Sequence, residues 1–143
     1  MYTSIAPFAC KLNAMTSAAT NRLQVLVLED NRETRLLLRY FLTSNHDVTF
    51  TSTAEEAIAA DERSTFDLYI LDINLGGEET GVDVLQALRA RHRGRRIQSI
   101  ALTAYARPSD RRKFIKEGFD YFLAKPFTQE KLNSILQQIK TAA

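Results

Sequence analysis

Short apolar runs alternate along the chain with segments whose apolar residues recur at helical spacing. The apolar runs, rich in aliphatic, aromatic and Thr residues, lie at 23–30, 47–52, 67–72, 96–104 and 119–125. Runs of this length between turn residues predict strands. The segments between and after them predict helices at 31–45, 53–64, 81–92, 108–117 and from 128 to about 141.

Individual residues at the segment ends support these boundaries. Thr53 and Glu56 have the spacing of a capping box, and Pro108 suits the first turn of a helix. Gly118 predicts a helix stop, and Thr128 predicts the start of the last helix. The apolar positions of that last helix lie three and four residues apart, at Leu132, Ile135, Leu136 and Ile139.

Strands that alternate with helices predict βα units and a parallel sheet. The fold class is therefore α/β, a doubly wound five-stranded sheet of (βα)5 type with both faces buried. Residues 22–143 form one domain, because the pattern uses this stretch as far as about 141. Residues 1–21 contain no Asp or Glu and show no clear period, and they lack the apolar core of a signal peptide. They predict a disordered N-terminal tail.

Composition and charge narrow the function classes. The chain has 143 residues, of which 45% are hydrophobic and 25% charged, and its net charge is +2. These values are ordinary for a soluble globular protein and give no overall field toward DNA or a membrane. Cys10 is the only cysteine, which suits a reducing cytoplasm, and no apolar run has transmembrane length. We therefore expect a cytoplasmic protein with no direct DNA binding and no membrane segment.

Polar residues stand at the carboxyl ends of the predicted strands. The first strand ends at Glu29 and Asp30, the third at Asp72, the fourth at Thr103 and the fifth at Lys125. In an open parallel sheet, ligands bind outside this edge. We expect these side chains to meet there, with Lys125 as a cation for Asp72.

Three carboxylates in one small site repel one another and raise each other's pKa. A hard divalent cation relieves that repulsion, and carboxylates, water and a backbone carbonyl such as that of Asn74 are suitable ligands for Mg²⁺. A metal, an ammonium and a hydroxyl together suit a phosphoryl group. A carboxylate such as Asp72 can accept that group covalently as an aspartyl phosphate.

The sequence resembles a response-regulator receiver domain of the CheY-like, single-domain type. The resemblance covers about 22–141 and is carried by "ED" (29–30), "LYILDINL" (68–75), "ALTA" (101–104) and "FLAKPF" (122–127). Each motif alone is weak, but all four occur in order on a (βα)5 pattern. The resemblance implies the flavodoxin-like strand order 2-1-3-4-5.

The resemblance also implies roles at the strand ends. Asp72 would accept a phosphoryl group from a phosphohistidine on a sensor histidine kinase or a histidine phosphotransfer protein. Asp30 would bind Mg²⁺ (or Mn²⁺) directly, Glu29 largely through water, and Asn74 through its backbone carbonyl. The domain would thus catalyse its own Mg²⁺-dependent phosphorylation and dephosphorylation without being a conventional enzyme.

The remaining implied roles concern signalling. Lys125 and Thr103 would contact phosphoryl oxygens, and the Lys125–Pro126 bond would be cis. Phe122 would move inward with Thr103 as a switch and change the face formed by the helix at 108–117, the strand at 119–125 and the last helix. A downstream protein would bind this face, or two copies would pair through it after phosphorylation.

Three features depart from the family pattern. The loop "NLGGEETG" (74–81) lacks the usual proline and is one residue longer, which predicts a more mobile loop. Phe122 has no hydroxyl, so a switch there would act by packing, and Phe122 is equally compatible with a core role. Tyr105 is large enough to shield the phosphoryl group from water.

Several alternatives remain open. The chain is either a stand-alone receiver with no output domain or the receiver of a hybrid histidine kinase. A pseudo-receiver that only binds proteins is the alternative class. A haloacid-dehalogenase-like phosphatase would carry a second Asp where Asn74 stands, and a flavin binder would need glycines in the acidic loop "EDNRET" (29–34).

Two Arg-rich segments and two histidines carry weaker signals. "RARHRGRR" (89–96) predicts a solvated helix end rather than a nucleic-acid patch. "RPSDRRK" (107–113) lies on the expected signalling face and suits an acidic partner. His46 and His92 predict solvated positions rather than catalytic ones.

Overall fold

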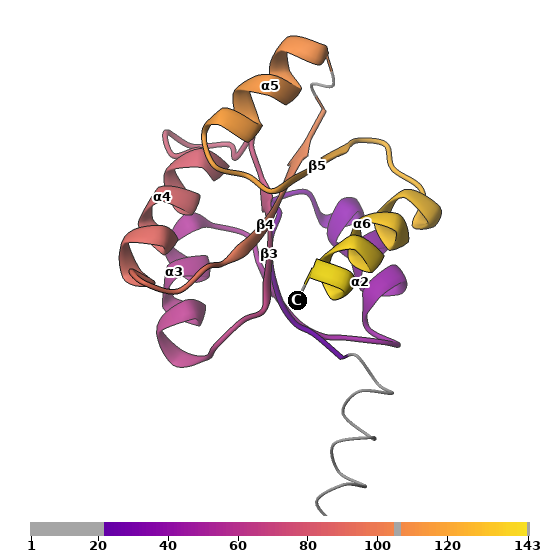
Figure 1. The fold of residues 1–143 in the computed structure, drawn as a ribbon, viewed down its shortest axis with the longest axis horizontal. Coiled ribbons are helices and arrows are strands. Elements are labelled where there is room, and N and C mark those ends of the chain that lie inside the picture. The colour runs from indigo at the N-terminus through magenta and orange to yellow at the C-terminus, as the bar shows by residue number, and fades with distance from the viewer. Residues whose placement is uncertain (1–21, 105–106, 143) are drawn as a thin grey trace, which may run out of the picture.

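The computed structural model describes residues 22–104 and 107–142. In this part of the chain, strands and helices alternate from end to end (Figure 1). The strands are β1 (Gln24–Leu28), β2 (Asp47–Thr51), β3 (Leu68–Asp72), β4 (Gln98–Thr103) and β5 (Tyr121–Ala124). The helices are α2 (Arg32–Leu42), α3 (Ala54–Arg63), α4 (Gly81–Arg91), α5 (Pro108–Lys116) and α6 (Gln129–Ala142).

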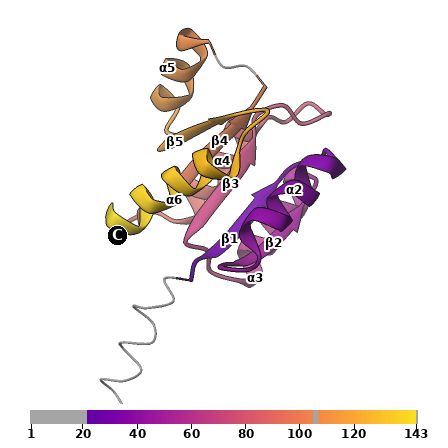
Figure 2. The same ribbon diagram turned by 90° about the vertical axis from the view of Figure 1, so that its right-hand side faces the viewer.

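The five strands form one parallel sheet in the order β2-β1-β3-β4-β5. Helices α2 and α6 lie on one face, and α3 and α4 lie on the other, with α5 beyond them beside β5 (Figures 1 and 2). The predicted fold class and strand order are confirmed. The central strands β1 and β3 therefore bring their carboxyl ends together in the middle of the edge.

Side chains of the central strands point alternately into two cores. Leu26 and Leu28 pack toward α3 and α4, whereas Val25 and Val27 pack toward α2 and α6. Every residue of β3 is buried, including Asp72 at its end. Strands covered on both faces read as continuous apolar runs, which is why they are conspicuous in the sequence.

The helix boundaries follow the capping residues that the sequence indicates. Thr53 Oγ1 accepts a hydrogen bond from the Glu56 backbone N–H at 3.1 Å, and Thr128 Oγ1 accepts one from the Lys131 backbone N–H at 3.2 Å. Pro108 is the first residue of α5. Gly118 follows that helix with φ +113°, a left-handed conformation that favours glycine.

The predicted solvation of both histidines is wrong. His46 is buried, and its Nδ1 accepts a hydrogen bond from the Leu23 backbone N–H at 3.2 Å. Burial, followed by the charges of Lys140 and Arg22, lowers the pKa of His46. His92 Nε2 lies 2.8 Å from a carboxylate oxygen of Asp61, which is itself buried. Both histidines therefore contribute to packing between elements distant in sequence.

Asp61 joins α3 to α4 and β3 through a buried polar cluster. Its carboxylate accepts hydrogen bonds from the Tyr69 hydroxyl at 2.5 Å and from Arg91 Nε at 2.9 Å, beside His92. Burial alone would raise the pKa of Asp61, but the bonds from Arg91, Tyr69 and His92 lower it below its ordinary value. The buried carboxylate is thus ionised and fully engaged, as a buried charge must be.

Three arginines of the Arg-rich segment make hydrogen bonds to other parts of the fold. Besides the Arg91 contact with Asp61, Arg89 donates to the backbone carbonyl of Gly118 and Arg95 donates to that of Phe66 at 2.6 Å. Arg91 and Arg95 are nevertheless exposed, as predicted, whereas Arg89 is half-buried. Across the described residues, no helix combines the length and apolar character needed to cross a membrane.

Candidate functional site

Three carboxylates meet at the carboxyl edge of the sheet. Glu29 and Asp30 directly follow β1, and Asp72 ends β3. These strands are neighbours, with Leu28 paired to Leu71, so the residues that follow them converge. One carboxylate oxygen from each acid lies within 4.8 Å of those of the other two. Glu29 and Asp72 are buried, whereas Asp30 is exposed, so the cluster opens to solvent on the Asp30 side.

Lys125 supplies the cation of the site. Its Nζ lies 2.5 Å from Glu29 Oε1 and 3.4 Å from Asp72 Oδ2. The sequence indicates Asp72 as the partner of this lysine, and the structure places Glu29 closer. The backbone N–H of Lys125 donates to the Thr103 carbonyl at 2.7 Å, and the Lys125–Pro126 bond is cis, as expected.

The electrostatics of the site favour binding of a further positive charge. Burial, together with hydrogen bonding to Glu29 and its charge, raises the pKa of Asp72 to about 8, although Lys125 acts in the opposite direction. Burial would lower the pKa of Lys125, but hydrogen bonding to Glu29 and the charges of Asp72 and Glu29 raise it. The lysine is thus charged, and a proton or a metal ion is needed to offset the remaining carboxylate repulsion.

The loop after β3 is anchored to the acids by backbone groups. The Asn74 backbone N–H donates to Asp72 Oδ1 at 3.1 Å, and the Gly76 backbone N–H donates to Asp30 Oδ2 at 3.2 Å. Gly81 lies against the backbone carbonyl of Asp72, with no room there for a Cβ atom. The glycine-rich loop therefore begins and ends in contact with the acid cluster.

Thr103 and Phe122 lie on β4 and β5, the two strands that follow β3 in the sheet. Thr103 is buried at the end of β4, in register with Ala124 of β5. Phe122 is half-buried and stacks on Phe114 of α5, with 6.1 Å between the ring centroids. The Arg111 guanidinium lies 4.9 Å from the centroid of the Phe122 ring. Tyr105 lies outside the described residues.

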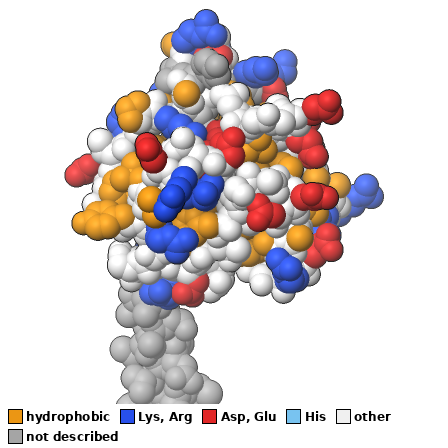
Figure 3. Space-filling view, turned by 180° about the vertical axis from the view of Figure 1, so that it is seen from behind, with side chains coloured by type: hydrophobic (Ala, Val, Ile, Leu, Met, Phe, Trp, Pro, Cys, Tyr) orange, Lys and Arg blue, Asp and Glu red, His pale blue; other side chains and the backbone are white. Residues whose placement is uncertain are grey.

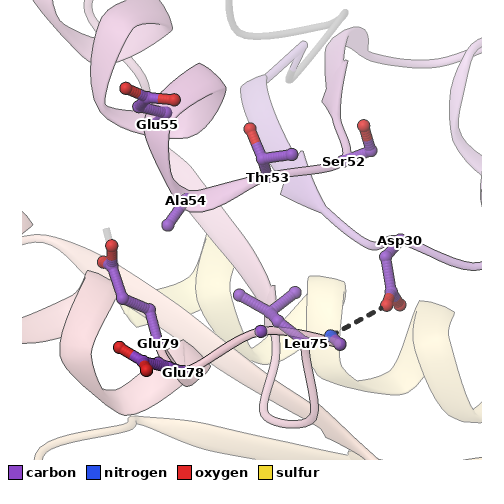
Figure 4. Close-up of a pocket in the computed structure, with 10 residues that line it drawn as sticks. Asp30, Ser52, Thr53, Ala54, Glu55, Leu75, Glu78 and Glu79 are labelled. Carbon is purple, nitrogen blue, oxygen red and sulfur yellow. Dashed lines mark hydrogen bonds between the residues drawn. The ribbon is translucent and has the colours of Figure 1, made fainter.

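A cavity of about 600 Å³ lies beside the acid cluster rather than over Asp72. Its walls come from Asp30, from the β2–α3 connection and Glu55 in the first turn of α3, and from the loop with Leu75, Glu78 and Glu79 (Figure 4). Four carboxylates make this cavity unsuitable for an anion. A phosphoryl group is therefore better matched to Asp72 and Lys125 than to this cavity.

Sequence reasoning missed two features of this region. The acid cluster and Lys125 follow from strand-end positions, but the cavity depends on how two loops face each other. Glu29 and Lys125 are 96 residues apart, and their contact depends on the directions of both side chains. The sequence around either residue alone does not predict this contact. The shared position of both residues at the carboxyl edge was the available signal.

Comparison with known proteins identifies the family. The sequence model of the response regulator receiver domain matches residues 25–137. The chain belongs to this family. The receiver domain thus accounts for most of the chain, and this membership favours a receiver over the phosphatase and flavin-binding alternatives.

Relatives and solved structures agree with this assignment. A 14.6 kDa uncharacterized protein of Leptolyngbya boryana is 34% identical over 118 residues, which are 82% of this chain and 89% of that protein. The transcriptional regulatory protein TctD of Salmonella typhimurium is 34% identical over 120 residues, 82% of this chain and 51% of TctD. This receiver therefore spans about half the length of TctD.

One similar solved structure contains a metal ion. The receiver domain of the sensor histidine kinase PA1611 of Pseudomonas aeruginosa is 31% identical, with a TM-score of 0.74 over 84% of this chain and 98% of that one. Its structure has a magnesium ion coordinated in the active-site cleft. Receiver domains bind Mg²⁺ in this cleft and interact with histidine kinases or phosphotransfer proteins.

Proposed function

We propose that this receiver accepts a phosphoryl group on Asp72 from a phosphohistidine donor and signals through the face formed by α5, β5 and α6. The observation that carries the proposal is a buried carboxylate at the end of β3, 3.4 Å from the Lys125 ammonium and beside two further acids. Asp72 is the acceptor because it alone of the three is flanked by both Lys125 and the loop amide of Asn74.

The acids and the loop fit a divalent metal. Glu29, Asp30 and Asp72, with the backbone carbonyl of Asn74, would hold Mg²⁺ or Mn²⁺, in keeping with three carboxylate oxygens within 4.8 Å and a raised Asp72 pKa. When bound, the metal supplies positive charge that offsets the carboxylates and the incoming phosphoryl oxygens. Glu29 would act through water, because its Oε1 lies 2.5 Å from the Lys125 ammonium.

The chain's own residues then carry the transfer. A carboxylate oxygen of Asp72 forms a bond to phosphorus, the bond from phosphorus to the donor imidazole nitrogen breaks, and that nitrogen keeps the electron pair. Lys125 balances charge on one phosphoryl oxygen, and the Thr103 hydroxyl donates to another. For this, the ammonium must shift from Glu29 toward the new phosphoryl group.

Phe122 links the site to the signalling face. It lies on β5 opposite Ala101 of β4, on the α5 side of the sheet, and it stacks on Phe114. A movement of Thr103 would free space beside β5, and a packing change of Phe122 would then alter α5. A downstream protein reads this change, without direct DNA binding, in the cytoplasm that the lone Cys10 suits.

Intact-mass measurement tests the proposal. Incubation with Mg²⁺ and acetyl phosphate should add one phosphoryl group to the wild type and none to Asp72→Asn, while the exposed-site control Asp67→Asn should behave as wild type. An equal gain in Asp72→Asn would refute the acceptor assignment. If no variant gains mass, a beryllium-fluoride and Mg²⁺ titration separates a dedicated donor from a pseudo-receiver, since only an intact acceptor site binds it.

Tyr105 is proposed to slow dephosphorylation by shielding the aspartyl phosphate from water. Tyr105→Ala should then lose its phosphoryl group faster than the wild type after the donor is removed, as followed by intact mass. Tyr105→Phe keeps the ring and should match the wild type. Equal lifetimes in all three proteins would remove this role from Tyr105.

A further inference from the structure

Helix α3 and the loop after β3 border a groove that extends beyond the cavity beside the acid cluster. A second depression of about 360 Å³ shares Ala54, Glu55 and Glu79 with that cavity. It continues along α3 past Ile58 to Glu62, which lies in the last turn of the helix. The two depressions therefore form one continuous groove, which we call the α3 groove.

Apolar side chains form the floor of the α3 groove, and carboxylates surround it. Ala54, Ile58 and Leu75 are partly buried and pack against the core. Five exposed acids belong to the lining: Asp30, Glu55, Glu62, Glu78 and Glu79. Glu78 and Glu79 form no ion pair with any residue that the structure describes. The groove therefore fits a segment that carries cations next to an apolar side chain.

Helix α5 presents the complementary surface. Arg112, Ile115 and Lys116 are spaced by three and four residues, so they share one side of the helix, and all three are exposed. The one carboxylate of the helix, Asp110, is already paired with Arg107 at 3.1 Å. Figure 3 shows Lys and Arg side chains at the end of the molecule that carries α5, and Asp and Glu side chains along the flank that carries α3 and α4. The chain thus has two surfaces of opposite charge, although its net charge is only +2.

We propose that the α3 groove of one copy of the chain binds α5 of a second copy, with Ile115 on the apolar floor and Arg112 and Lys116 beside the carboxylates. Charge complementarity selects this occupant, since opposite potentials across an interface favour encounter and exclude wrong partners. The contact is heterologous, because it joins two different surfaces and leaves each copy with one of them free. Symmetric pairing of two α5 helices would instead bring their exposed cations together, which is unfavourable.

The α3 groove reaches the phosphoryl site through Asp30. This residue lines the groove and also belongs to the acid cluster, which opens to solvent on the same side. A second copy seated in the groove would therefore narrow the open side of the site and bring its cations next to Asp30. The contact between copies does not depend on the proposed function, because it involves no chemistry at Asp72.

Sedimentation velocity of the unphosphorylated full chain tests the inference. The wild type should associate as its concentration rises, with a dissociation constant at least about tenfold larger in 0.5 M than in 0.05 M NaCl, because salt screens exposed charges. Arg112→Glu with Lys116→Glu should remain monomeric, and so should Glu55→Lys with Glu79→Lys, because each variant opposes like charges. An equimolar mixture of the two variants should associate again, since the basic α5 of one matches the acidic groove of the other.

Arg93→Glu with Lys131→Glu is the matched control. It changes the net charge as much as the α5 variant does, at two exposed side chains outside α5 and the α3 groove, and should associate as the wild type does. This control also separates the two modes of pairing, because Lys131 lies in the face formed by α5, β5 and α6.

Four outcomes would overturn the inference. They are a wild type that stays monomeric at every concentration, association that persists in the groove variant, loss of association in the control, and a mixture that stays monomeric although circular dichroism shows both variants folded. Association lost in the α5 variant and kept in the groove variant would assign the contact to symmetric α5 pairing instead. Failure of the proposed function appears separately, as no phosphoryl gain in the wild type.

Discussion

The ammonium nitrogen of Lys125 lies 2.5 Å from the Glu29 carboxylate. Asp72, the proposed acceptor, lies farther from that nitrogen, at 3.4 Å. The lysine is therefore held beside the reacting carboxylate by a neighbour on β1, and it can turn to a phosphoryl group without leaving the site. Glu29 thus has two roles in the proposal, as a metal-site acid and as the residue that positions Lys125.

Replacing Lys125 tests how strongly this cation stabilises the buried acids. Lys125→Met keeps most of the side-chain volume but leaves Glu29 and Asp72 without a cation in metal-free protein. We expect a loss of about 3 kcal/mol in the free energy of unfolding at pH 8, as for a broken buried ion pair. Urea unfolding in EDTA measures it. Lys116→Met, at an exposed lysine of α5, should change stability by less than about 0.5 kcal/mol, and equal losses in both variants would contradict the assignment.

The raised Asp72 pKa predicts how stability depends on pH. The pKa of Asp72 is about 8 in the folded protein, against an ordinary value of 3.8. Between pH 3.8 and about 8, the folded state therefore keeps a proton that the unfolded state has released. This contribution to stability is complete below the lower value and is lost as the pH rises through about 8. Metal-free wild type should therefore lose stability relative to Asp72→Asn as the pH rises from about 5 to about 8, by up to about 1.4 kcal/mol per pH unit, and little more above that.

Urea unfolding in EDTA at several pH values measures this difference in stability. The same measurement with Mg²⁺ in place of EDTA is a second test. Mg²⁺ needs the deprotonated carboxylates, so its stabilisation of the wild type should grow over the same pH range and be much smaller in Asp72→Asn. Glu78→Gln, at an exposed loop acid, should follow the wild type. If the free energies of unfolding of wild type and Asp72→Asn differ by the same amount at every pH, the raised pKa of Asp72 is contradicted.

The sequence predicts the fold well because its signals are local. Strands buried on both faces appear as apolar runs, and Thr53, Pro108, Gly118 and Thr128 mark helix ends by backbone chemistry that involves only near neighbours. The acid cluster is also predictable, because parallel strands bring their carboxyl ends to one edge.

The sequence cannot predict contacts that depend on the packing of separate elements. His92 at a helix end has the local pattern of a solvated residue, and Asp61 lies in an acid-rich helix segment. These two residues are 31 positions apart in the chain. They meet only because α3 and α4 pack side by side on the sheet. The preference of Lys125 for Glu29 over Asp72 depends on side-chain directions in the same way.

The Asp61 cluster predicts a stability effect far from the phosphoryl site. Asp61→Ala would leave the Tyr69 hydroxyl, Arg91 and His92 without their shared acceptor. The expected loss is about 3 kcal/mol in the free energy of unfolding, as when one partner of a buried ion pair is removed. Urea unfolding at pH 7 measures it, with Glu62→Gln as an exposed control on the same helix. A loss below about 1 kcal/mol would mean that water replaces the carboxylate at little cost.

Gly81 predicts a coupling between helix packing and the acceptor residue. A Cβ at this position would overlap the backbone carbonyl oxygen of Asp72, and the Gly81 N–H donates to the Ile73 carbonyl at 3.2 Å. Gly81→Ala must therefore push the start of α4 away from the end of β3. We expect a loss of about 2 kcal/mol in stability, as for overpacking, and slower phosphoryl gain at Asp72.

Gly77→Ala is the matched control, because an added Cβ there meets nothing within 4 Å. It lies in the same loop and should leave both stability and phosphoryl gain close to wild type. Parallel urea unfolding and intact-mass time courses on the two variants separate the contact at Gly81 from a general sensitivity of the glycine-rich loop. Equal effects of the two substitutions would show that loop flexibility, rather than the approach of α4 to the Asp72 carbonyl, controls the position of the acceptor.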